Sequence, residues 1–505
     1  MLLYFCLVSM TYVPLDQLLV PTLAILMAVG VLQFLSFLLL RDIRRAGIYS
    51  TLVVWLFYSS TFMVIVIFKV NRPDFACAAS VLGAPFLKVV WLVILFLFYR
   101  CLRSKSDFQQ LTIRLNQVSL FLVALEFLII LFQWIDTNCV KFPAVTECPQ
   151  FVRESPEAVA GAARPDIYYI ILDKMACHEA LSELFHYDNG PFLEHLRRKN
   201  FYIATNSYSN YPRTHLSLAS SLNMSYLQKA AKECGPDSID QSLLNEMIRK
   251  NALVRCLKSV GYKFINISSY YGPTAWIPDA NENVGCGAFD EFTVNFFAST
   301  WVGLFDWSNQ TLEEQLRAER RSTFRHLIEV SKSPVPKFVF AHILLPHEPY
   351  LFKADGTPQS KGPVYAGDRW TNDAKQAYLE QLRYTEKEME PVIDQIIANS
   401  KSCPIIVLQS DHGTESTGLL TNPHPTDAFL KERFGILNAY LLPEEKRPRL
   451  YDKISPVNSF RLILNSYFNF HLPLLEDRSY YSPSPYTFRY TDETAALQRN
   501  NSSQE

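Results

Sequence analysis

The sequence has no excess of basic residues, no Cys-x-x-Cys pair and no internal repeat. Its 505 residues carry 48 Lys and Arg against 49 Asp and Glu, a formal net charge of -1. Basic residues are not clustered outside the loops discussed below, so nucleic acid is not expected as a partner. The missing Cys-x-x-Cys pair argues against a zinc ribbon or a thioredoxin-type site.

The start of the chain also lacks the features of a cleaved signal peptide. Residues 1–13 are apolar, but they have no basic start and no small-residue cleavage site, so they form an under-length span or an interfacial segment. Longer apolar stretches follow, each reaching the roughly 20 residues that cross a bilayer. They are residues 18–40, 48–68, 76–99 and 117–135. We therefore predict a transmembrane helix bundle of four or five spans over residues 1–136.

Basic residues predict the orientation of these spans. The loops after the first and third spans are the richer ones, with Arg41, Arg44, Arg45, Arg100, Arg103, Lys105 and Arg114 against Lys69 and Arg72 between the second and third. The positive-inside rule places the richer loops in the cytoplasm. We expect a multi-pass protein of the cytoplasmic (inner) membrane whose remaining chain is extracytoplasmic, or periplasmic. Lys88 and Glu126, each near the middle of a span, are expected to pair unless one reaches a headgroup region.

The rest of the chain reads as a linker, one large domain and a polar tail. Residues 137–164 are rich in Pro, Glu, Ala and Gly without periodicity, as in a linker. Within 165–480, helical patterns alternate with short apolar strands, which predicts an α/β domain with a mainly parallel sheet. The expected strands are 166–172, 201–204, 262–267, 337–345 and a run from 405, and the expected helices are 191–199, 240–259, 312–330, 373–399 and 455–468. Residues 481–505 have too little apolar content to demand order.

Two of the apolar strands end in an acid. Asp173 closes the first strand of the domain, and Asp411 and His412 follow the strand that begins at 405. Open α/β sheets bind ligands at the carboxyl edge of their strands. Oxygen and nitrogen donors placed there suit a divalent metal. A capping Asp and a loop His are the alternative for the second pair.

Thr214 is the candidate nucleophile. Pro212 ends the preceding segment, and the apolar residues after Thr214 recur at helical spacing, so Thr214 lies at or just before a helix N-terminus. The helix dipole and free N–H groups there stabilise an anion, and metal coordination can activate a hydroxyl. An ordinary N-cap Thr is the alternative, unless Asp173, Asp411 and His412 converge on it.

His347 lies between Pro346 and Pro349 just after the strand that ends near 345. A stiff backbone there would fix the imidazole at the ligand edge, where it can grip a phosphate oxygen or protonate a leaving group. His342 lies inside the same strand and is read first as a hydrogen-bonded core histidine.

The sequence contains ten cysteines and does not decide whether they form disulfides. In an exported domain Cys139 could pair with Cys148, and pairs could form among Cys177, Cys234, Cys256, Cys286 and Cys403. Buried free thiols are the alternative.

The order of four features along the chain resembles the sulfatase-like branch of the alkaline phosphatase superfamily. They are the strand ending at Asp173, the helix start at Thr214, the segment from His342 to Tyr350 and the strand ending in Ser410-Asp411-His412-Gly413. The layout resembles its membrane-anchored phosphotransferases, such as lipoteichoic acid synthases and lipid A phosphoethanolamine transferases. The likeness covers roughly residues 166–480, and the membrane region by layout alone.

The resemblance implies a set of site residues. Asp173, Thr214, Asp411 and His412 would hold one divalent ion, with zinc or manganese favoured and magnesium or calcium compatible. Thr214 would become covalently substituted and His347 would grip the substrate, with Arg213 and His342 as further substrate-binding candidates. Membrane lipid or envelope glycan would be the substrate.

The sequence departs from these relatives in informative ways. Asp173 stands where the transferases usually have Glu, and Lys174 stands where many sulfatases have a second Asp. The Cys-x-Pro-x-Arg motif that sulfatases convert to formylglycine is absent at Thr214, and its nearest echo, Cys234 to Ser238, has Ser in place of Arg. We therefore expect a metal-dependent phosphotransferase or phosphoesterase. A sulfatase-like ester hydrolase and a catalytically silent membrane scaffold are the alternatives.

Overall fold

The computed structural model describes residues 15–68, 84–104, 108–139, 164–285, 306–359 and 364–499. The chain divides into two compact units, which are treated separately below. The first holds residues 1–142 and 288–314, and the second holds residues 143–287 and 315–505. The predicted interfacial segment 1–13, most of the linker and the side chains of Lys88 and Glu126 lie outside the described residues.

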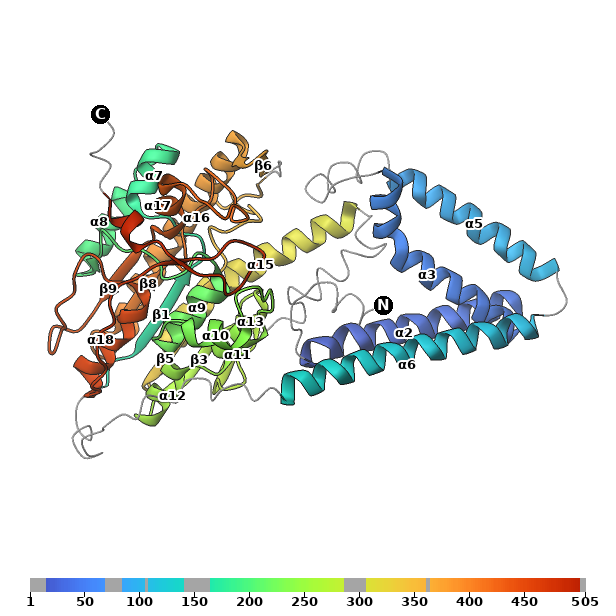
Figure 1. The fold of residues 1–505 in the computed structure, drawn as a ribbon, viewed down its shortest axis with the longest axis horizontal. Helices are drawn as coiled ribbons and strands as arrows, with labels where there is room; N and C mark the ends of the chain where they lie inside the picture. Colours follow the sequence, from blue (N-terminus) through green and yellow to red (C-terminus); the bar gives the residue numbers. More distant parts are fainter. Residues whose placement is uncertain are drawn as a thin grey trace. The chain divides into compact units, whose positions relative to one another are not determined.

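The first unit is helical where it is described (Figure 1). Its helices are α2 (Leu15–Leu40), α3 (Ile43–Phe68), α5 (Ala84–Ser104) and α6 (Gln109–Cys139). Helix α3 contacts α2, α5 and α6, and Leu40, Ile48 and Leu102 form a small buried cluster. Among the described residues, one stretch, Leu23–Leu40, is apolar and long enough to cross a bilayer, with a mean hydropathy of 2.5. Leu26 and Met27 on this stretch are exposed, as lipid-facing residues would be.

The second unit is built on a seven-stranded sheet in the order β2-β9-β8-β1-β5-β3-β4. Its strands are β1 (Ile167–Leu172), β2 (Tyr202–Ile203), β3 (Lys263–Ile267), β4 (Glu282–Val284), β5 (Lys337–Ile343), β8 (Ile405–Gln409) and β9 (Asn438–Leu441). The strands from β8 to β4 run parallel, and β9 is antiparallel to both of its neighbours. The prediction of an α/β fold with a mainly parallel sheet is confirmed.

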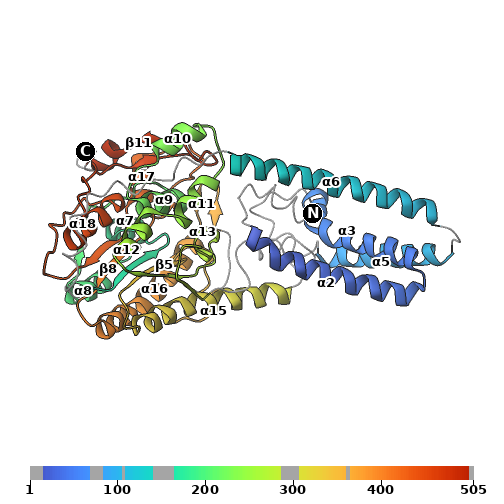
Figure 2. The ribbon, with the colours of Figure 1, turned by 90° about the horizontal axis from the view of Figure 1, so that it is seen from below.

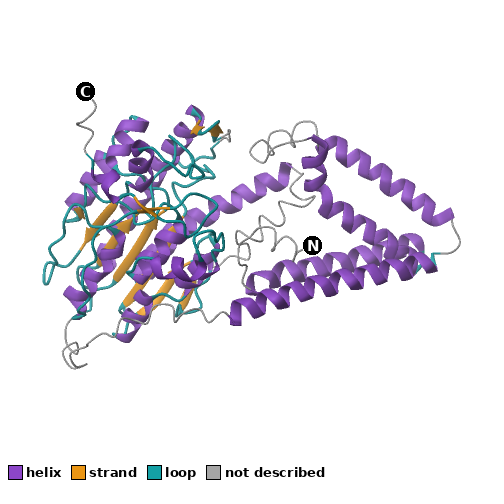
Figure 3. Ribbon diagram, viewed as in Figure 1, coloured by secondary structure: helices purple, strands orange, loops and turns teal. Residues whose placement is uncertain are grey.

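Helices cover both faces of this sheet (Figures 2 and 3). Tyr168, Ile170 and Leu172 share a core with residues of α7, α8, α15 and α16, whereas Tyr169 packs on Phe460 of α18. Strand residues that alternate between two apolar cores explain why β1 is apolar at every position. The helices are α7 (His178–Phe185), α8 (Gly190–Arg198), α9 (Thr214–Asn223), α10 (Gln228–Cys234), α11 (Ser242–Arg249), α12 (Ala252–Ser259), α13 (Gly272–Ala275), α15 (Asp306–Ser331), α16 (Asn372–Asn399), α17 (Asp427–Phe434), α18 (Pro456–Phe468) and α19 (Thr494–Gln498).

The register of the central strands places two acids at the same height, just beyond the carboxyl ends of neighbouring strands. Ile171 of β1 pairs with His342 of β5 on one side and with Gln409 of β8 on the other. Asp173 and Asp411 each come two residues later on adjacent parallel strands, so both leave the sheet at the same height. The carboxyl edge of β1, β5 and β8 therefore gathers the side chains that the sequence singled out.

The predicted helix 240–259 is instead two helices, α11 and α12. Asn251 separates them because its side-chain oxygen accepts a hydrogen bond from Val254 N at 2.9 Å and caps α12. An Asn cap competes with continuation of the preceding helix. The break lets both helices contact α9.

The end of the domain is more ordered than its composition suggested. The segment after Arg478 contains the hairpin β10 (Tyr480–Tyr481) and β11 (Thr491–Asp492), followed by α19. Tyr481, Ala496 and Leu497 are buried against Phe429, Leu430 and Phe434 around α17. The prediction of a polar tail from 481 fails for the described residues, because a few spaced apolar side chains find a surface that is already formed.

For the cysteines of this domain that the structure describes, the alternative of free thiols is favoured over disulfides. Cys177, Cys234 and Cys403 form no disulfide. Cys148 and Cys286 lie outside the described residues. The pair of Cys139 with Cys148 stays a prediction.

Candidate active site

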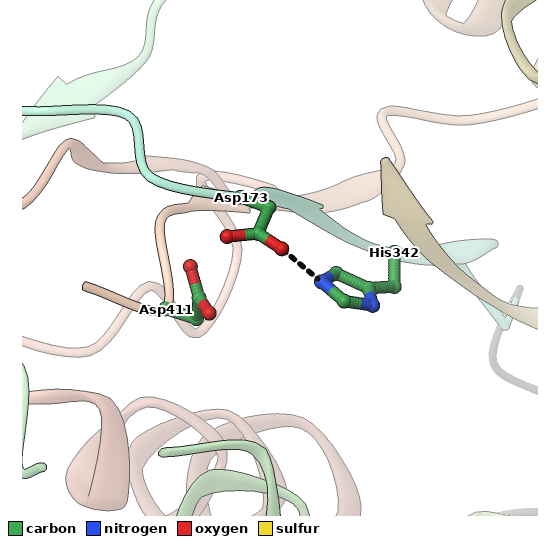
Figure 4. Close-up of side chains that lie close together, drawn as sticks. All are labelled: Asp173, His342 and Asp411. Carbon is green, nitrogen blue, oxygen red and sulfur yellow. Dashed lines mark ion pairs between the residues drawn. The ribbon is translucent and has the colours of Figure 1, made fainter. Parts of the chain in front are cut away.

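Asp173, His342 and Asp411 meet at the carboxyl edge of the sheet (Figure 4). Each offers one ligand atom, and these atoms lie within 4.8 Å of one another. All three residues are buried. Two carboxylates and an imidazole at this separation match the donor set of a divalent metal site.

The imidazole of His412 links the four residues predicted as metal ligands. Its Nε2 lies 3.2 Å from Thr214 Oγ1, 3.3 Å from Asp411 Oδ2 and 3.8 Å from Asp173 Oδ1. Its Nδ1 lies 3.0 Å from the Gly413 carbonyl, which accepts a hydrogen bond when that nitrogen carries the proton. This tautomer leaves the Nε2 lone pair facing the other three side chains. The structure thus brings together Asp173, Thr214, Asp411 and His412.

His342 belongs to the same cluster rather than to the core alone. Its Nε2 lies 3.3 Å from Asp173 Oδ2, and its Nδ1 lies 3.1 Å from Thr274 Oγ1. The reading of His342 as a core histidine therefore misses a candidate ligand. Its place near the carboxyl end of β5, beside β1, is the signal that could have found it.

Buried polar atoms without a hydrogen bond indicate whether these residues fit a metal ion. Asp173 Oδ1, Asp411 Oδ2 and His342 Nε2 are buried and make no hydrogen bond to a described residue, although Asp411 Oδ2 and His342 Nε2 each lie within ion-pair distance, 3.3 Å, of a neighbour in the cluster. Buried polar atoms without partners are rare in folded proteins and are expected where an ion binds. The donor chemistry and the unsatisfied atoms both fit a divalent cation.

Burial and mutual repulsion shape the charges of the cluster. Burial, followed by the neighbouring Asp173, raises the pKa of Asp411. Burial also opposes ionisation of Asp173, but the nearby His347, His342 and His412 together lower its pKa. Burial and Arg433 hold the pKa of His412 well below its usual range. His412 is therefore neutral near pH 7, the form that binds a metal.

Thr214 begins α9, as predicted from the sequence. The residue before it, Arg213, is extended, and no described side chain caps this helix end. The first intrahelical bond runs from Ser217 N to Arg213 O, which leaves the N–H groups of the first turn for a ligand. A helix N-terminus with uncapped N–H groups is a binding site for an anion such as a phosphate.

His347 and Arg213, both predicted to bind substrate, have different surroundings. His347 exposes 32% of its side chain, and among its neighbours it contributes most to lowering the pKa of Asp173. Gln381 of α16 fixes this loop by donating to the His347 carbonyl at 2.8 Å. Arg213 is buried and donates to Ser482 Oγ at 3.2 Å and to the Tyr486 carbonyl. Arg213 thus ties the C-terminal segment to the start of α9, and its contact with substrate stays a prediction.

A parallel α/β sheet with a hydroxyl, two carboxylates and two imidazoles at its carboxyl edge defines an enzyme of the sulfatase and phosphoesterase class. The sequence agrees, because the model of the sulfatase family matches residues 165–448, more than half of the chain. The chain belongs to the sulfatase family. No curated protein matches it.

Solved structures that match this chain include domains of two EptC proteins. The C-terminal periplasmic domain of EcEptC from Escherichia coli is 16% identical with a TM-score of 0.44, over 67% of this chain and 93% of that one. The corresponding domain of phosphoethanolamine transferase EptC from Campylobacter jejuni is 14% identical with a TM-score of 0.36, over 62% and 92%. An alkaline phosphatase superfamily protein from Vibrio parahaemolyticus is 12% identical with a TM-score of 0.38, over 67% and 80%.

Proposed function

We propose that the protein is a membrane-anchored, metal-dependent phosphotransferase or phosphoesterase that works through a covalent intermediate on Thr214. The observation that carries this proposal is the position of Thr214 Oγ1, which lies 3.2 Å from His412 Nε2 at the uncapped start of α9. A hydroxyl beside metal-binding donors and free N–H groups is suited to attack phosphorus.

In the first step, Thr214 Oγ forms a bond to phosphorus while the bond from phosphorus to the leaving oxygen breaks. The N–H groups of the first turn of α9 donate to the phosphoryl oxygens, whose negative charge the helix dipole also stabilises. The Thr214 proton passes to water, and the partly exposed His347 returns a proton to the departing oxygen. In the second step an acceptor hydroxyl, or water, forms a bond to phosphorus while the bond from phosphorus to Thr214 Oγ breaks. The proton of the acceptor passes to His347, and Thr214 Oγ takes a proton from water.

Asp173, Asp411, His412 and His342 are the residues that would hold one divalent cation. Zinc and manganese fit this mixture of carboxylate and imidazole donors best. The cation would supply Lewis acidity toward the phosphoryl group and a lower pKa for the Thr214 hydroxyl.

A membrane anchor would keep the site beside its substrate. The apolar helical stretch Leu23–Leu40 supports one membrane span, and the further apolar stretches of residues 1–136 support the proposal of several spans. The loop charges favour an extracytoplasmic domain at the cytoplasmic membrane. A lipid-borne donor and a lipid or glycan acceptor of the cell envelope fit this arrangement.

Mass spectrometry of the chain after incubation with an envelope lipid extract tests the proposal. We expect an adduct on the peptide containing Thr214, with a mass that identifies the transferred group. Ser221, in the last part of the same helix, is the control hydroxyl and should stay unmodified. A chain that remains unmodified and contains no metal would instead favour a silent scaffold.

Family membership favours a second candidate, a hydrolase of sulfate or phosphate esters. The two enzymes differ in the final acceptor. Adding a glycerol or glycan acceptor should divert the product from free phosphate to a new ester if the protein is a transferase. The product ratio of a hydrolase would not change.

A further inference from the structure

Thr274 is the partner of His342 on the ring nitrogen that does not face Asp173. Both residues are fully buried, and Thr274 Oγ1 lies 3.1 Å from His342 Nδ1. The other ring nitrogen, Nε2, lies 3.3 Å from Asp173 Oδ2 (Figure 4). A neutral imidazole carries its proton on one nitrogen and a lone pair on the other. The bond to Thr274 therefore decides which of the two Nε2 presents to the candidate metal cluster.

The hydrogen bonds around Thr274 can be arranged in two ways. In the first, its hydroxyl proton goes to His342 Nδ1, and the ring proton must then lie on Nε2. That N–H needs an acceptor, but Nε2 makes no hydrogen bond to a described residue, although Asp173 Oδ2 is within ion-pair distance. A buried N–H without a hydrogen bond is costly, so this arrangement is disfavoured.

In the second arrangement the ring proton lies on Nδ1, and Thr274 Oγ1 accepts it. The Ser269 hydroxyl, which accepts the Tyr271 N–H at 3.2 Å, then donates to the second lone pair of Thr274 Oγ1 at 2.7 Å. Thr274 in turn donates to the Tyr271 carbonyl at 3.3 Å. Every donor in this network has an acceptor, and Nε2 of His342 keeps a lone pair that a cation can use.

The backbone that carries Thr274 is tied to two strands of the sheet. Asn266, in β3, donates from Nδ2 to the Thr274 carbonyl at 3.1 Å and to Asn283 Oδ1, in β4, at 2.8 Å. Asn283 in turn pairs with the N–H and the carbonyl of Ile277, each at 3.0 Å. The hydroxyl of Thr274 is thus held in a fixed position beside His342.

We infer that Thr274 is a positioning residue, which keeps the proton of His342 on Nδ1 and so leaves the Nε2 lone pair for a cation. A histidine that binds a metal commonly donates its other ring N–H to a fixed acceptor, which sets the tautomer and the ring orientation. The inference rests on the proposed function, which places a divalent ion among Asp173, Asp411 and His412. It adds the residue that makes His342 a metal donor rather than a hydrogen-bond donor to Asp173.

Nitrogen NMR of the metal-free, full-length chain in detergent tests the tautomer itself. Both ring nitrogens of the histidines are labelled with a spin-active isotope, and the His342 signals are identified by their absence from the spectrum of His342→Gln. At about pH 8, where imidazole is ordinarily neutral, we expect the proton on Nδ1 in the wild type and in Thr274→Ser. In Thr274→Val the acceptor is lost, and the proton should move to Nε2, beside the Asp173 carboxylate.

Zinc affinity tests the consequence for the cation. Thr274→Val should weaken zinc binding by roughly 10–100-fold, the loss typical of an outer-shell partner. Thr274→Ser keeps the hydroxyl and should bind zinc nearly as tightly as the wild type. In a His342→Gln background, Thr274→Val should cause no further loss, because the hydroxyl acts through this imidazole. Competition with a coloured chelator measures each affinity.

Thr385→Val is the matched control. Thr385 is also fully buried, and its Oγ1 donates to the Gln381 carbonyl at 2.7 Å within α16. Both valine variants therefore lose one buried hydroxyl group. Thr385→Val should leave the zinc affinity and the His342 signals unchanged.

The outcomes separate this inference from the proposed function. A proton on Nε2 of His342 in the metal-free wild type would overturn the inference. Unchanged zinc affinity in Thr274→Val, or a further loss in the His342→Gln background, would overturn it as well, and a wild-type chain that binds one ion would still support the proposed function. A wild type without zinc would contradict the proposed function, while a proton that moves from Nδ1 to Nε2 in Thr274→Val would still establish Thr274 as the residue that sets the tautomer. The wild-type spectrum and Thr274→Ser keep the test decisive if Thr274→Val does not fold.

Discussion

The two ends of strand β1 carry two acids with opposite surroundings. Asp166 precedes the strand, and its Oδ2 lies 2.6 Å from Lys337 Nζ, which also donates to the Ser333 carbonyl. Asp173 follows the strand, and its buried Oδ1 has no hydrogen-bond partner among the described residues. Its neighbours include a second carboxylate, Asp411. A satisfied acid stabilises the fold, whereas unsatisfied acids gathered at one edge store repulsion that a bound cation would relieve.

The largest effect is expected from removing the candidate nucleophile at the unsatisfied edge. Thr214→Ala should lower kcat for an aryl phosphate ester by at least about 10³-fold, because the covalent step is lost. Thr214→Ser should keep part of the activity. Ser221→Ala, near the end of α9, is the control and should keep nearly all of it. Equal losses in Thr214→Ala and Ser221→Ala would contradict a nucleophilic role.

Replacing one acid at each edge of the sheet by Asn, Asp411 after β8 and Asp166 before β1, tests the comparison directly. Asp411→Asn should weaken zinc binding by more than the 10–100-fold typical of an outer-shell partner, whereas Asp166→Asn should leave zinc binding unchanged. With the metal chelated, Asp411→Asn should raise Tm at pH 7, because it removes one of two buried like charges. Asp166→Asn should lower Tm. Calorimetry with and without chelator measures both, and Tm changes of the same sign would remove the distinction.

At the start of β1, where Asp166 is paired with Lys337, a substitution should change the stability of the protein and nothing else. Lys337→Met leaves the Asp166 carboxylate without its ammonium, and we expect a loss of about 3 kcal/mol in the free energy of unfolding. Denaturant titration measures this loss. The activity and metal content of the folded fraction should equal those of the wild type. A parallel loss of metal would mean that the two edges are coupled.

Local patterns predicted one part of the candidate site, and tertiary packing decided the rest. Asp173, Asp411 and Thr214 follow strand ends or begin a helix, and these are properties of short stretches of sequence. The carboxylates of Glu348 and Glu415 that meet the Lys174 ammonium come from segments more than 170 residues away, so no local pattern indicates them. The ordered C-terminal segment was missed for the same reason, because Leu497 is buried only against a surface around α17.

Glu386 is another buried acid with an unsatisfied oxygen, so it tests whether such an acid is by itself a sign of a metal site. It lies on α16, and its Oε2 accepts a hydrogen bond from Tyr187 OH at 2.6 Å, while its Oε1 has no partner among the described residues. Unlike Asp173, it does not join the Asp173, His342 and Asp411 group, the one candidate metal cluster among the described residues. We therefore expect Glu386→Gln to leave metal content and activity unchanged.

Proton linkage is the effect that Glu386 should show, and it is the smallest of the series. Burial raises the pKa of Glu386 from 4.5 to about 8 in the folded chain. The folded state then binds more protons than the unfolded state between these pH values, so stability falls as pH rises from about 4.5 to about 8. Glu386→Gln cannot ionise and should raise Tm by a few degrees at pH 8 and leave it nearly unchanged at pH 4.5. Scanning calorimetry across this range measures the difference, with the partly exposed Glu388→Gln as control. A Tm gain that does not depend on pH would show that Glu386 is not the group that titrates.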